Sequence, residues 1–485
     1  MKTAQQSCAA TTPAPRNLSH VGKTAIVTDS TCDADLKDAA MLLGRPAASA
    51  APVTRRLSSC LRDARGQRVT GGDRTVIAAI DQFADTVLRR GRCAETILDA
   101  AIARPDCPMA QACGAVYHLL DETRSGIEQA KSLLEQARRG QFAATDREVM
   151  FVRAISAIAE SEPRLADSFF LALAETAPED LLAGYIGHLH FLNHGRFDAM
   201  LAHAQLLRRA NPFDPFALGM LSFALEEAGA ADAALDAALA ANAVDPSIAW
   251  VHHTVAHVFK TQGLSAEGIT WLMQHAHHWE SCGSSMFTHN WWHAQLLALD
   301  IDAPTRALDL YDHLIAAEAT RSVSSFVNAS SLLARLELRD IDVGSRWLPL
   351  AEEARRRVGE HVLPFIDLHY GITLGYAGDL AGCTALKRSM ALHASHQRGE
   401  LREAWAFAGV PLTDAVIAGC FGDWRNACRH FACGLPKAML IGGSRLQREL
   451  LHEFRAHAGL RADPRSAAGV RSERRFESAI SALAM

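Results

Sequence analysis

Apolar residues recur at helical spacing along most of the chain. From about residue 74, segments of 10 to 18 residues place Ala, Leu, Ile, Val and Phe at i, i+3 and i+4, and each segment ends near Gly or Pro. Ala and Leu dominate, whereas runs of Val, Ile and Thr typical of strands are scarce. The pattern predicts an all-α protein.

An internal repeat gives these helices an order. Gly195, Gly229 and Gly263 are spaced 34 residues apart, and each stands between two apolar segments. Helix, Gly turn, helix and Asp/Pro turn at this period is the tetratricopeptide (TPR) pattern. A single hairpin cannot bury both of its faces, so hairpins stack. We therefore expect a TPR-like superhelix of about eight hairpins over residues 142–455, with later first helices near 287–300, 325–339, 364–378 and 405–422.

The two ends of the chain lack this periodicity. Residues 1–60 are rich in Ala, Ser, Thr, Pro and Arg and predict a partly ordered N-terminal head with one short helix near 33–43. Residues 61–460 form the predicted TPR-like α-superhelical domain. Residues 461–485 are polar and basic and predict a frayed C-terminal tail.

Composition narrows the class of protein. A hydrophobic content of 49% over 485 residues is enough for a large core, and the net charge of −5 argues against a nucleic-acid or anionic-membrane partner. No run of 18 apolar residues and no secretory h-region is present, so we expect a cytoplasmic protein without membrane spans. The eleven cysteines form no CxxC pair, which argues against a zinc ribbon or a disulfide framework.

Two histidine pairs carry the strongest chemical signal. His253/His257 and His289/His293 each have i, i+4 spacing, which places both rings on one helix face, as when two imidazoles share a metal ion. The second pair follows the first by 36 residues, close to one repeat, and both lie on expected first helices. Neighbouring helices pack roughly 8–10 Å apart. The four rings can therefore converge on one metal or ligand, although buried histidines can also serve packing alone.

Further segments resemble a known family. WVHHTVAHV, HNWWH, EDLLAGYIGHLHF at 179–191, PFIDLHYGITLGYAG at 364–378 and the GGS-x-x-QR segment at 442–448 are similar to the tetratricopeptide repeat protein 38 family. The resemblance covers roughly residues 62–460 and implies an all-α, TPR-like superhelix without a settled function. Two positions depart from the family pattern. Lys260 stands where the family usually has Glu, and Arg445 where it usually has His.

The resemblance also groups other residues with the histidines. Asp367 and His369 are expected beside the two pairs, and one carboxylate with several imidazoles is a common donor set for Fe, Mn, Co, Cu or Zn. Glu226 and Glu227 are candidate proton-transfer residues with Asp367, or acceptors for a ligating imidazole. The alternatives are a helix N-terminal Asp, a packed His and a solvated turn.

Substrate-binding candidates complete the hypothesis. Trp292 shares a face with His289 and could form a wall against a planar substrate. Gly442–Ser444 with Arg445, Gln447 and Arg448 could hold an anion at a helix start, or Ser444 could simply cap the last helix. Tyr311 follows on a second helix, where it could pack or contact substrate.

These observations leave two classes of function open. One is a metal-dependent enzyme acting on a small molecule inside the superhelix, with oxidoreductase or oxygen-dependent chemistry in specialised metabolism ahead of hydrolysis, because neutral imidazoles leave charge on a redox metal. The other is a non-catalytic TPR scaffold that binds a peptide or protein partner. A homo-oligomer is compatible with either, because the edges of a solenoid are exposed.

Overall fold

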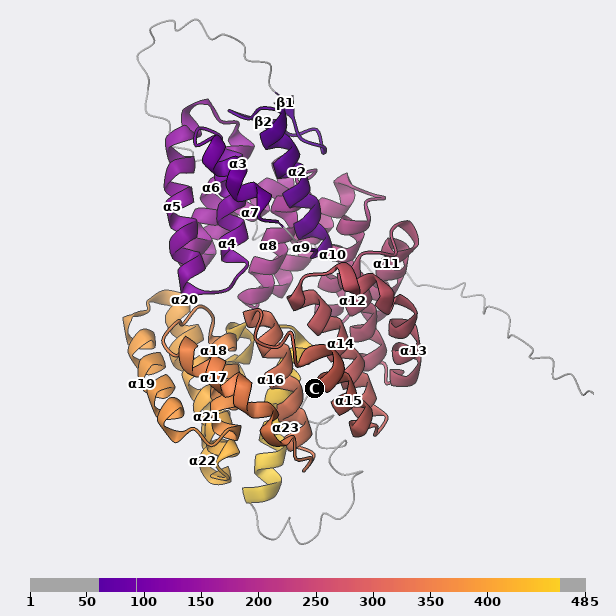
Figure 1. Cartoon of the computed structure of the whole chain (residues 1–485), viewed down its shortest axis with the longest axis vertical. Helices are drawn as coiled ribbons and strands as arrows, with labels where there is room; N and C mark the ends of the chain where they lie inside the picture. The colour runs from indigo at the N-terminus through magenta and orange to yellow at the C-terminus, as the bar shows by residue number, and fades with distance from the viewer. Residues whose placement is uncertain (1–60, 93, 463–485) are drawn as a thin grey trace, which may run out of the picture. The chain divides into compact units, whose positions relative to one another are not determined.

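Stacked helical hairpins build the structure, a computed structural model that describes residues 61–92 and 94–462 (Figure 1). The described residues all fall within one compact unit. The predicted head at 1–60, with its helix near 33–43, lies outside the described residues, as does the predicted tail from residue 463 on. None of the described helices is long and apolar enough to cross a membrane.

The secondary structure is almost entirely helical, as the apolar pattern predicts. A short antiparallel pair, β1 (Leu61–Arg62) and β2 (Arg68–Val69), comes first, with Leu61 opposite Val69. The α-helices are α2 (Arg74–Arg89), α3 (Thr96–Ala103), α4 (Pro108–Leu119), α5 (Arg124–Gly140), α6 (Asp146–Ala159), α7 (Pro163–Thr176), α8 (Leu181–Asn193), α9 (Phe197–Ala210), α10 (Pro215–Glu227), α11 (Ala231–Val244), α12 (Ala249–Thr261), α13 (Ser265–His275), α14 (Ser284–Asp300), α15 (Pro304–Leu310), α16 (Val323–Glu337), α17 (Trp347–Arg357), α18 (Pro364–Tyr376), α19 (Leu380–His396), α20 (Gly399–Arg402), α21 (Val410–Cys420), α22 (Trp424–Gly434) and α23 (Arg445–Ala462).

Short tighter or wider helical turns interrupt or extend several of these helices. The 3₁₀ turns are η1 (Gln141–Ala143), η2 (Ala276–Ser281), η4 (Gly344–Arg346) and η6 (Leu435–Ile441), and the π-helical turns are η3 (Tyr311–Ile315) and η5 (Glu403–Gly409).

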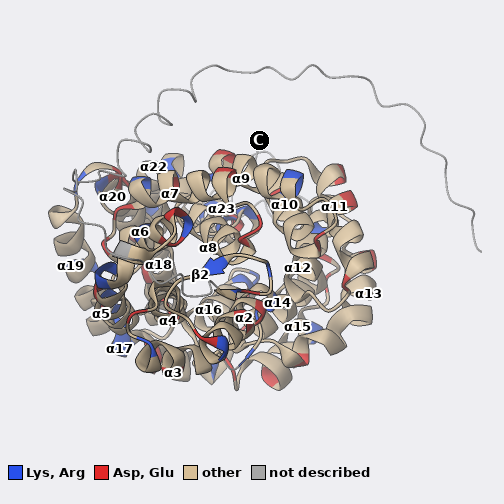
Figure 2. Cartoon of the chain, turned by 90° about the horizontal axis from the view of Figure 1, so that it is seen from above, with Lys and Arg blue, Asp and Glu red and all other residues tan. Residues whose placement is uncertain are grey.

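Eight hairpins follow one another from α6/α7 to α21/α22, which agrees with the expected TPR-like superhelix. Gly195, Gly229 and Gly263 occupy the turns of three of them with φ of 64°, 81° and 70°. This left-handed backbone is strained for residues with a Cβ, which explains the 34-residue glycine spacing. The first helices contact one another along the stack, and in Figure 2 α12 and α14 lie nearer the middle than α11 and α13.

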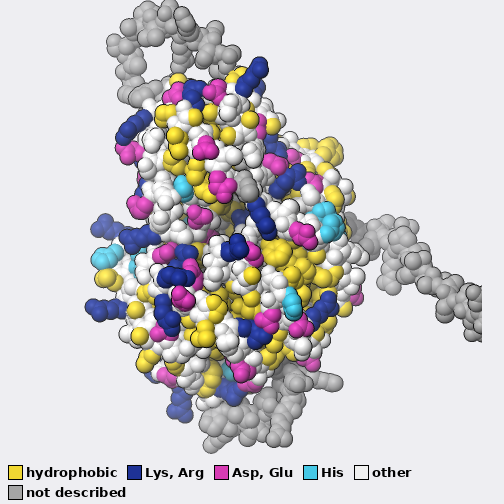
Figure 3. Space-filling view, viewed as in Figure 1, with side chains coloured by type: hydrophobic (Ala, Val, Ile, Leu, Met, Phe, Trp, Pro, Cys, Tyr) yellow, Lys and Arg dark blue, Asp and Glu magenta, His cyan; other side chains and the backbone are white. Residues whose placement is uncertain are grey.

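The first helices are buried on nearly all sides, because they pack against their own hairpin, both neighbouring hairpins and the interior. In α12 every residue from Ala249 to Val258 is buried, polar ones included. The second helices instead present a polar face to solvent. On the face shown in Figure 3, acidic and basic side chains are interspersed among apolar ones.

The last helix, α23, packs against α22 and also contacts two first helices, α16 and α21. Arg335 of α16 donates from Nε to Glu453 at 2.9 Å and from Nη2 to the Leu446 carbonyl oxygen at 2.9 Å, while Arg339 donates to the other Glu453 oxygen at 2.9 Å. All three partners are fully or mostly buried, so α23 is held from the inner side of the superhelix. This position was not predicted from the sequence.

Candidate metal centre and cavity

The two histidine pairs lie on neighbouring inner helices. His253 and His257 belong to α12, and His289 and His293 to α14. Asn290 fixes the register between the helices, because its side-chain amide donates to the Ala249 carbonyl oxygen at 3.0 Å. The i, i+4 spacing then turns both pairs toward each other, as the sequence predicts.

The four imidazole rings form one cluster. In five of the six possible pairs the ring centroids lie 4.5–5.0 Å apart. One nitrogen atom from each of His253, His289 and His293 lies within 4.8 Å of the other two. His257 completes the cluster through ring contacts with His253 at 4.5 Å and His293 at 4.7 Å. A single ion between the rings would be within reach of imidazole nitrogens from both helices after small side-chain rotations.

Hydrogen bonds on the outer side of the rings determine where the protons are. Three rings place Nδ1 against an oxygen that can only accept, namely His253 against the Trp250 carbonyl at 3.1 Å, His257 against the Glu226 carboxylate at 2.9 Å and His289 against the Asn328 amide oxygen at 2.9 Å. Each Nδ1 must therefore be the donor, which leaves a lone pair on each Nε2. This is the arrangement by which proteins orient metal-binding imidazoles.

The Nε2 nitrogen of His293 has two possible roles, as a ligand of a bound cation or as a donor in a hydrogen-bond network. Its Nε2 lies 3.3 Å from Nε2 of His289, which carries a lone pair. Either His293 is protonated at Nε2 and donates to His289, or both nitrogens face a bound cation. Nε2 of His257 is buried and has no hydrogen-bond partner among the described residues. The network alternative therefore leaves one buried acceptor unsatisfied, which is costly, whereas a cation would satisfy it.

Burial disfavours charge on the rings of His253, His289 and His293. Desolvation, with smaller contributions from the neighbouring rings, lowers the pKa of His253 and of His293 well below the ordinary value. Desolvation also lowers the pKa of His289 to about 4, although the hydrogen bond that its ring donates to Asn328 acts in the opposite direction. Neutral imidazoles are the form that ligates metal ions.

Glu226 and Glu227 form a second acidic group behind His257. Their carboxylate oxygens lie within 4.8 Å of a His257 nitrogen. Burial would raise the pKa of Glu226, but His257 and Arg445 together lower it to about 2, whereas burial and the adjacent Glu226 charge raise the pKa of Glu227 to about 7. Arg445 donates from Nη2 to Glu226 at 2.5 Å, and its backbone N–H donates to both Glu227 oxygens at 2.9 and 3.1 Å. These carboxylates already have cationic and N–H partners, so the group is less suited to a metal than the four histidines.

A cavity of about 350 Å³ adjoins the cluster. His253 and His289 line it, whereas His257 and His293 are not among the lining residues and are 0% and 1% exposed. Other lining polar groups include Arg90, Glu122, Glu162, His361, His393 and side chains of α8, α16 and α23. Most of the remaining wall is apolar, including Ile186, Phe223, Val327, Phe365, Ile366 and Leu440. An ion in the cluster could therefore meet a molecule in the cavity only through the side formed by His253 and His289.

The aromatic candidates lie away from the cavity. Trp292 is 0% exposed and stacks on His289 with ring planes 15° apart, and the Arg335 guanidinium lies 5.5 Å from the Trp292 ring centroid. Trp292 thus supports His289 from behind and is not among the cavity-lining residues. Tyr311 is buried in the π-helical turn η3, also outside the lining, and burial raises the pKa of its hydroxyl.

The GGS segment caps α23. The backbone N–H of Ser444 donates to the Gln447 side chain at 2.9 Å, and the backbone N–H of Gln447 is 3.3 Å from the Ser444 hydroxyl, so the two residues form a capping box. Ser444 and Gln447 line the cavity, but Arg445 and Arg448 do not. Arg448 donates to the Gly443 carbonyl and lies 3.8 Å from Glu227. Lys260 pairs with Asp300 at 2.8 Å. The arginines therefore face carboxylates of the protein.

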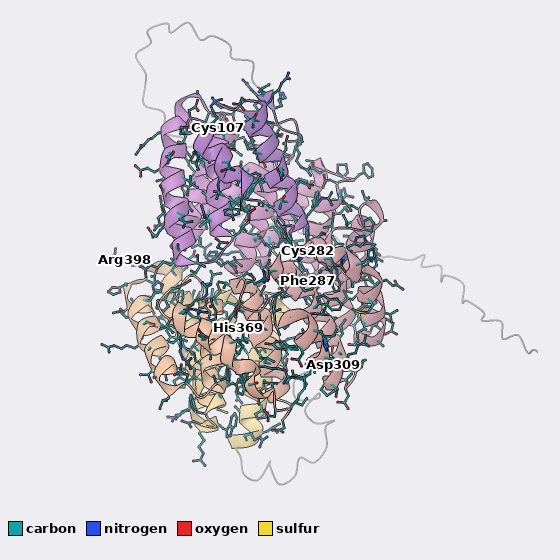
Figure 4. The ribbon with its side chains drawn as sticks, in the orientation of Figure 1. Cys107, Cys282, Phe287, Asp309, His369 and Arg398 are labelled. Carbon is teal, nitrogen blue, oxygen red and sulfur yellow. The ribbon has the colours of Figure 1, made fainter. Side chains whose placement is uncertain are left out.

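Asp367 and His369 are not brought to the four histidines. His369 is 1% exposed, and its Nδ1 donates to the Phe365 carbonyl oxygen at 2.8 Å (Figure 4). Asp367 accepts from Nδ1 of His361 at 2.5 Å. His361 lines the cavity and was missed by sequence reasoning, because it stands in the turn before α18, six residues from its partner, where no periodic pattern marks it.

Cys282 stands just before α14, between the two histidine pairs in sequence (Figure 4). It is 2% exposed, and burial raises the pKa of its thiol to about 11. A thiol that stays protonated is a poor ligand and nucleophile. We therefore interpret Cys282 as a packing residue.

Comparison with known proteins gives a limited result. No protein-family model matches the chain, so membership of the tetratricopeptide repeat protein 38 family remains a prediction from the quoted segments. Among solved structures the chain is similar to the human IFIT1 dimer with m7Gppp-AAAA, with 12% sequence identity and a TM-score of 0.37 over 84% of this chain and 94% of that one. A likeness at this level says nothing about what the present chain binds.

Proposed function

We propose that the protein binds one divalent transition-metal ion at His253, His257, His289 and His293 and a small molecule in the adjoining cavity. The observation that supports this most is that one nitrogen atom from each of His253, His289 and His293 lies within 4.8 Å of the other two, beside the buried Nε2 of His257, which has no partner among the described residues. His369 is not part of this ligand set. Glu226 would hold the ring of His257 in the ligating tautomer, and Trp292 would hold that of His289.

The finer proposal is that this centre is catalytic. Fe, Mn, Co, Cu and Zn all accept imidazole ligands, and a neutral donor set favours oxidative or oxygen-dependent chemistry over hydrolysis. When bound, such an ion would supply Lewis acidity or redox capacity. The protein would contribute a mostly apolar chamber that excludes water and orients one molecule beside His253 and His289. This would suit an oxidoreductase of specialised metabolism, with a hydrolase as the alternative.

A partner-binding scaffold is the second candidate, and the fold alone favours it. Stacked helical hairpins most often present a concave surface to a peptide or protein. Binding also requires fewer assumptions than catalysis. In this chain, however, α23 already occupies part of the inner side, through Arg335 and Glu453. A scaffold function would therefore use other surfaces or require α23 to move.

Metal content separates these candidates. The untagged protein, purified without added metal and again after reconstitution, is analysed by elemental mass spectrometry beside the double variant His253→Gln/His289→Gln. The matched control is His194→Gln, which also changes a cavity-lining histidine, located directly after α8 and outside the cluster. We expect near one equivalent of a transition metal in the parent and control, and at least a tenfold loss in the double variant, with circular dichroism showing that all three are folded.

Two results would contradict the metal proposal. A parent without metal even after reconstitution would leave the histidines as a packing network. Metal retained by the folded double variant would place the ion elsewhere. In either case the scaffold candidate would lead, and partner binding should then be unaffected by His253→Gln/His289→Gln.

A further inference from the structure

A second polar group lies on the cavity wall and is not used by the metal proposal. His361 stands in the turn between α17 and α18 with φ of 51°. A residue with a Cβ seldom adopts this left-handed backbone, and such residues concentrate at functional sites. The turn directs the His361 side chain to the cavity, which it lines, while the side chain stays only 7% exposed.

The contact with Asp367 fixes the orientation and tautomer of the His361 ring. Nδ1 of His361 lies 2.5 Å from a carboxylate oxygen of Asp367, which is itself 1% exposed. The imidazole therefore donates its Nδ1 proton to Asp367 and keeps a lone pair on Nε2. That Nε2 is buried and has no hydrogen-bond partner among the described residues. Because His361 lines the cavity, this unsatisfied acceptor lies where a ligand could reach it.

The surroundings of His361 fit a ligand site. Its ring lies 4.9 Å from that of His393 and 5.8 Å from that of Trp405, which meets it edge-on at 83°. Trp405 belongs to the π-helical turn η5, and π-helical turns occur frequently at functional sites. His393 and Trp405 line the cavity too. His393 accepts at Nε2 from Gln397 at 3.1 Å, so its Nε2 is already occupied, in contrast to that of His361.

We propose that His361 and Asp367 form a proton-transfer dyad for a weakly acidic O–H group, as in a phenol, on an apolar molecule in the cavity. The O–H proton moves to Nε2 of His361, and its electron pair stays on the oxygen of the molecule. Asp367 remains ionised and stabilises the imidazolium, and the same proton returns to product. An apolar molecule is expected because apolar side chains form most of the wall. The inference rests on the cavity part of the proposed function and does not require the metal.

The test uses 4-nitrophenol, which absorbs visible light only as the phenolate. Metal-free protein is titrated with it at a pH where the free phenol is mostly protonated, and bound phenol is quantified by equilibrium dialysis. We expect the parent to bind it as phenolate, and His361→Gln and Asp367→Asn to lower the phenolate fraction of the bound phenol at least tenfold. His313→Gln changes an exposed histidine outside the cavity lining and should retain the parent signal.

Several outcomes would overturn the dyad. These are an unchanged phenolate fraction in folded His361→Gln, bound phenol that is neutral in the parent, or no binding at millimolar phenol. If Asp367→Asn does not fold, the phenolate fraction bound by His361→Gln is sufficient to test the dyad. The titration uses metal-free protein, so a result against the dyad does not depend on whether the protein has a metal centre. Elemental analysis tests the metal centre separately.

Discussion

A single buried imidazole, His203 on α9, shows how strongly this interior disfavours charge. It is 0% exposed, neither ring nitrogen has a hydrogen-bond partner among the described residues, and its ring packs against Phe191 at 5.3 Å. Burial lowers the pKa of His203 to about 3. In the unfolded chain the pKa returns to about 6.5. The unfolded state therefore binds an extra proton between these values, and the stability of the fold decreases as the pH falls from about 6.5 toward 3.

We predict that His203→Leu raises the free energy of unfolding, and raises it more in acid. Leu removes two unsatisfied buried nitrogens, and at pH 5 it also removes a proton-linked penalty of about 1.4 kcal/mol per pH unit. The gain at pH 5 should exceed the gain at pH 7 by about 2 kcal/mol. Urea denaturation followed by circular dichroism at both pH values measures this, and an equal gain at both would contradict it.

Placement of individual side chains from sequence succeeded where helix geometry governs them. The spacing of His253/His257 and His289/His293 is enough to place the rings, because two neighbouring first helices carry them in register. It fails for His361 and Asp367, whose contact depends on a turn with unusual backbone. It fails for Arg445 too, since Glu226 lies 219 residues away in sequence.

At the scale of an element, the backbone of the connection from η6 to α23 passes very close to another segment of main chain. Gly442 has φ 83° and ψ −164°, a region open essentially to glycine alone. A Cβ at Gly442 would lie 2.2 Å from the carbonyl oxygen of Asn193, at the end of α8. Gly229 has a similar φ of 81° but open space around the position of a Cβ.

We predict that Gly442→Ala destabilises the protein by at least about 2 kcal/mol more than Gly229→Ala. Both substitutions strain the backbone by about 1–3 kcal/mol, but only the first also forces apart two segments of main chain. The matched pair is compared by chemical denaturation. Equal losses in the free energy of unfolding would mean that the two main-chain segments at Gly442 can move apart without further destabilising the protein.

The expected first helices were largely correct because each is a long apolar segment. The expected 325–339 and 364–378 correspond to α16 and α18 within two residues at each end. The expected helix at 405–422 is instead split into η5 and α21. Apolar spacing cannot distinguish a π-helical turn from an α-helix, since one extra residue per turn hardly alters the pattern of a segment in which most residues are apolar.

For the whole molecule, the buried ion pairs of α23 connect the last helix to the middle of the stack. Glu453 is 7% exposed and accepts from both Arg335 and Arg339. Arg335 also lies over the ring of Trp292, which in turn stacks on His289. Contacts between residues so far apart in the sequence leave no local sequence pattern. The packing of α23 against the inner side of the stack could therefore not be predicted.

We predict that Arg335→Met lowers the free energy of unfolding by about 3–5 kcal/mol, because it leaves Glu453 buried with Arg339 alone. The double variant Arg335→Met/Glu453→Leu should recover most of this loss, because apolar groups of similar size replace the pair. Denaturation of the parent, both single variants and the double variant gives the coupling energy. Simple additivity of the two losses would show that the pair is not energetically linked.

The position of α23 also sets an order of events during synthesis. It leaves the ribosome after every helix that it contacts, and the earlier hairpins can stack as they emerge, since domains fold from the N-terminus during translation. Until α23 docks, the part of the cavity wall formed by Gln447 is missing. We therefore expect the nascent chain to pass through a stage in which its future interior is open, and loading at that stage would be faster than loading of the finished protein.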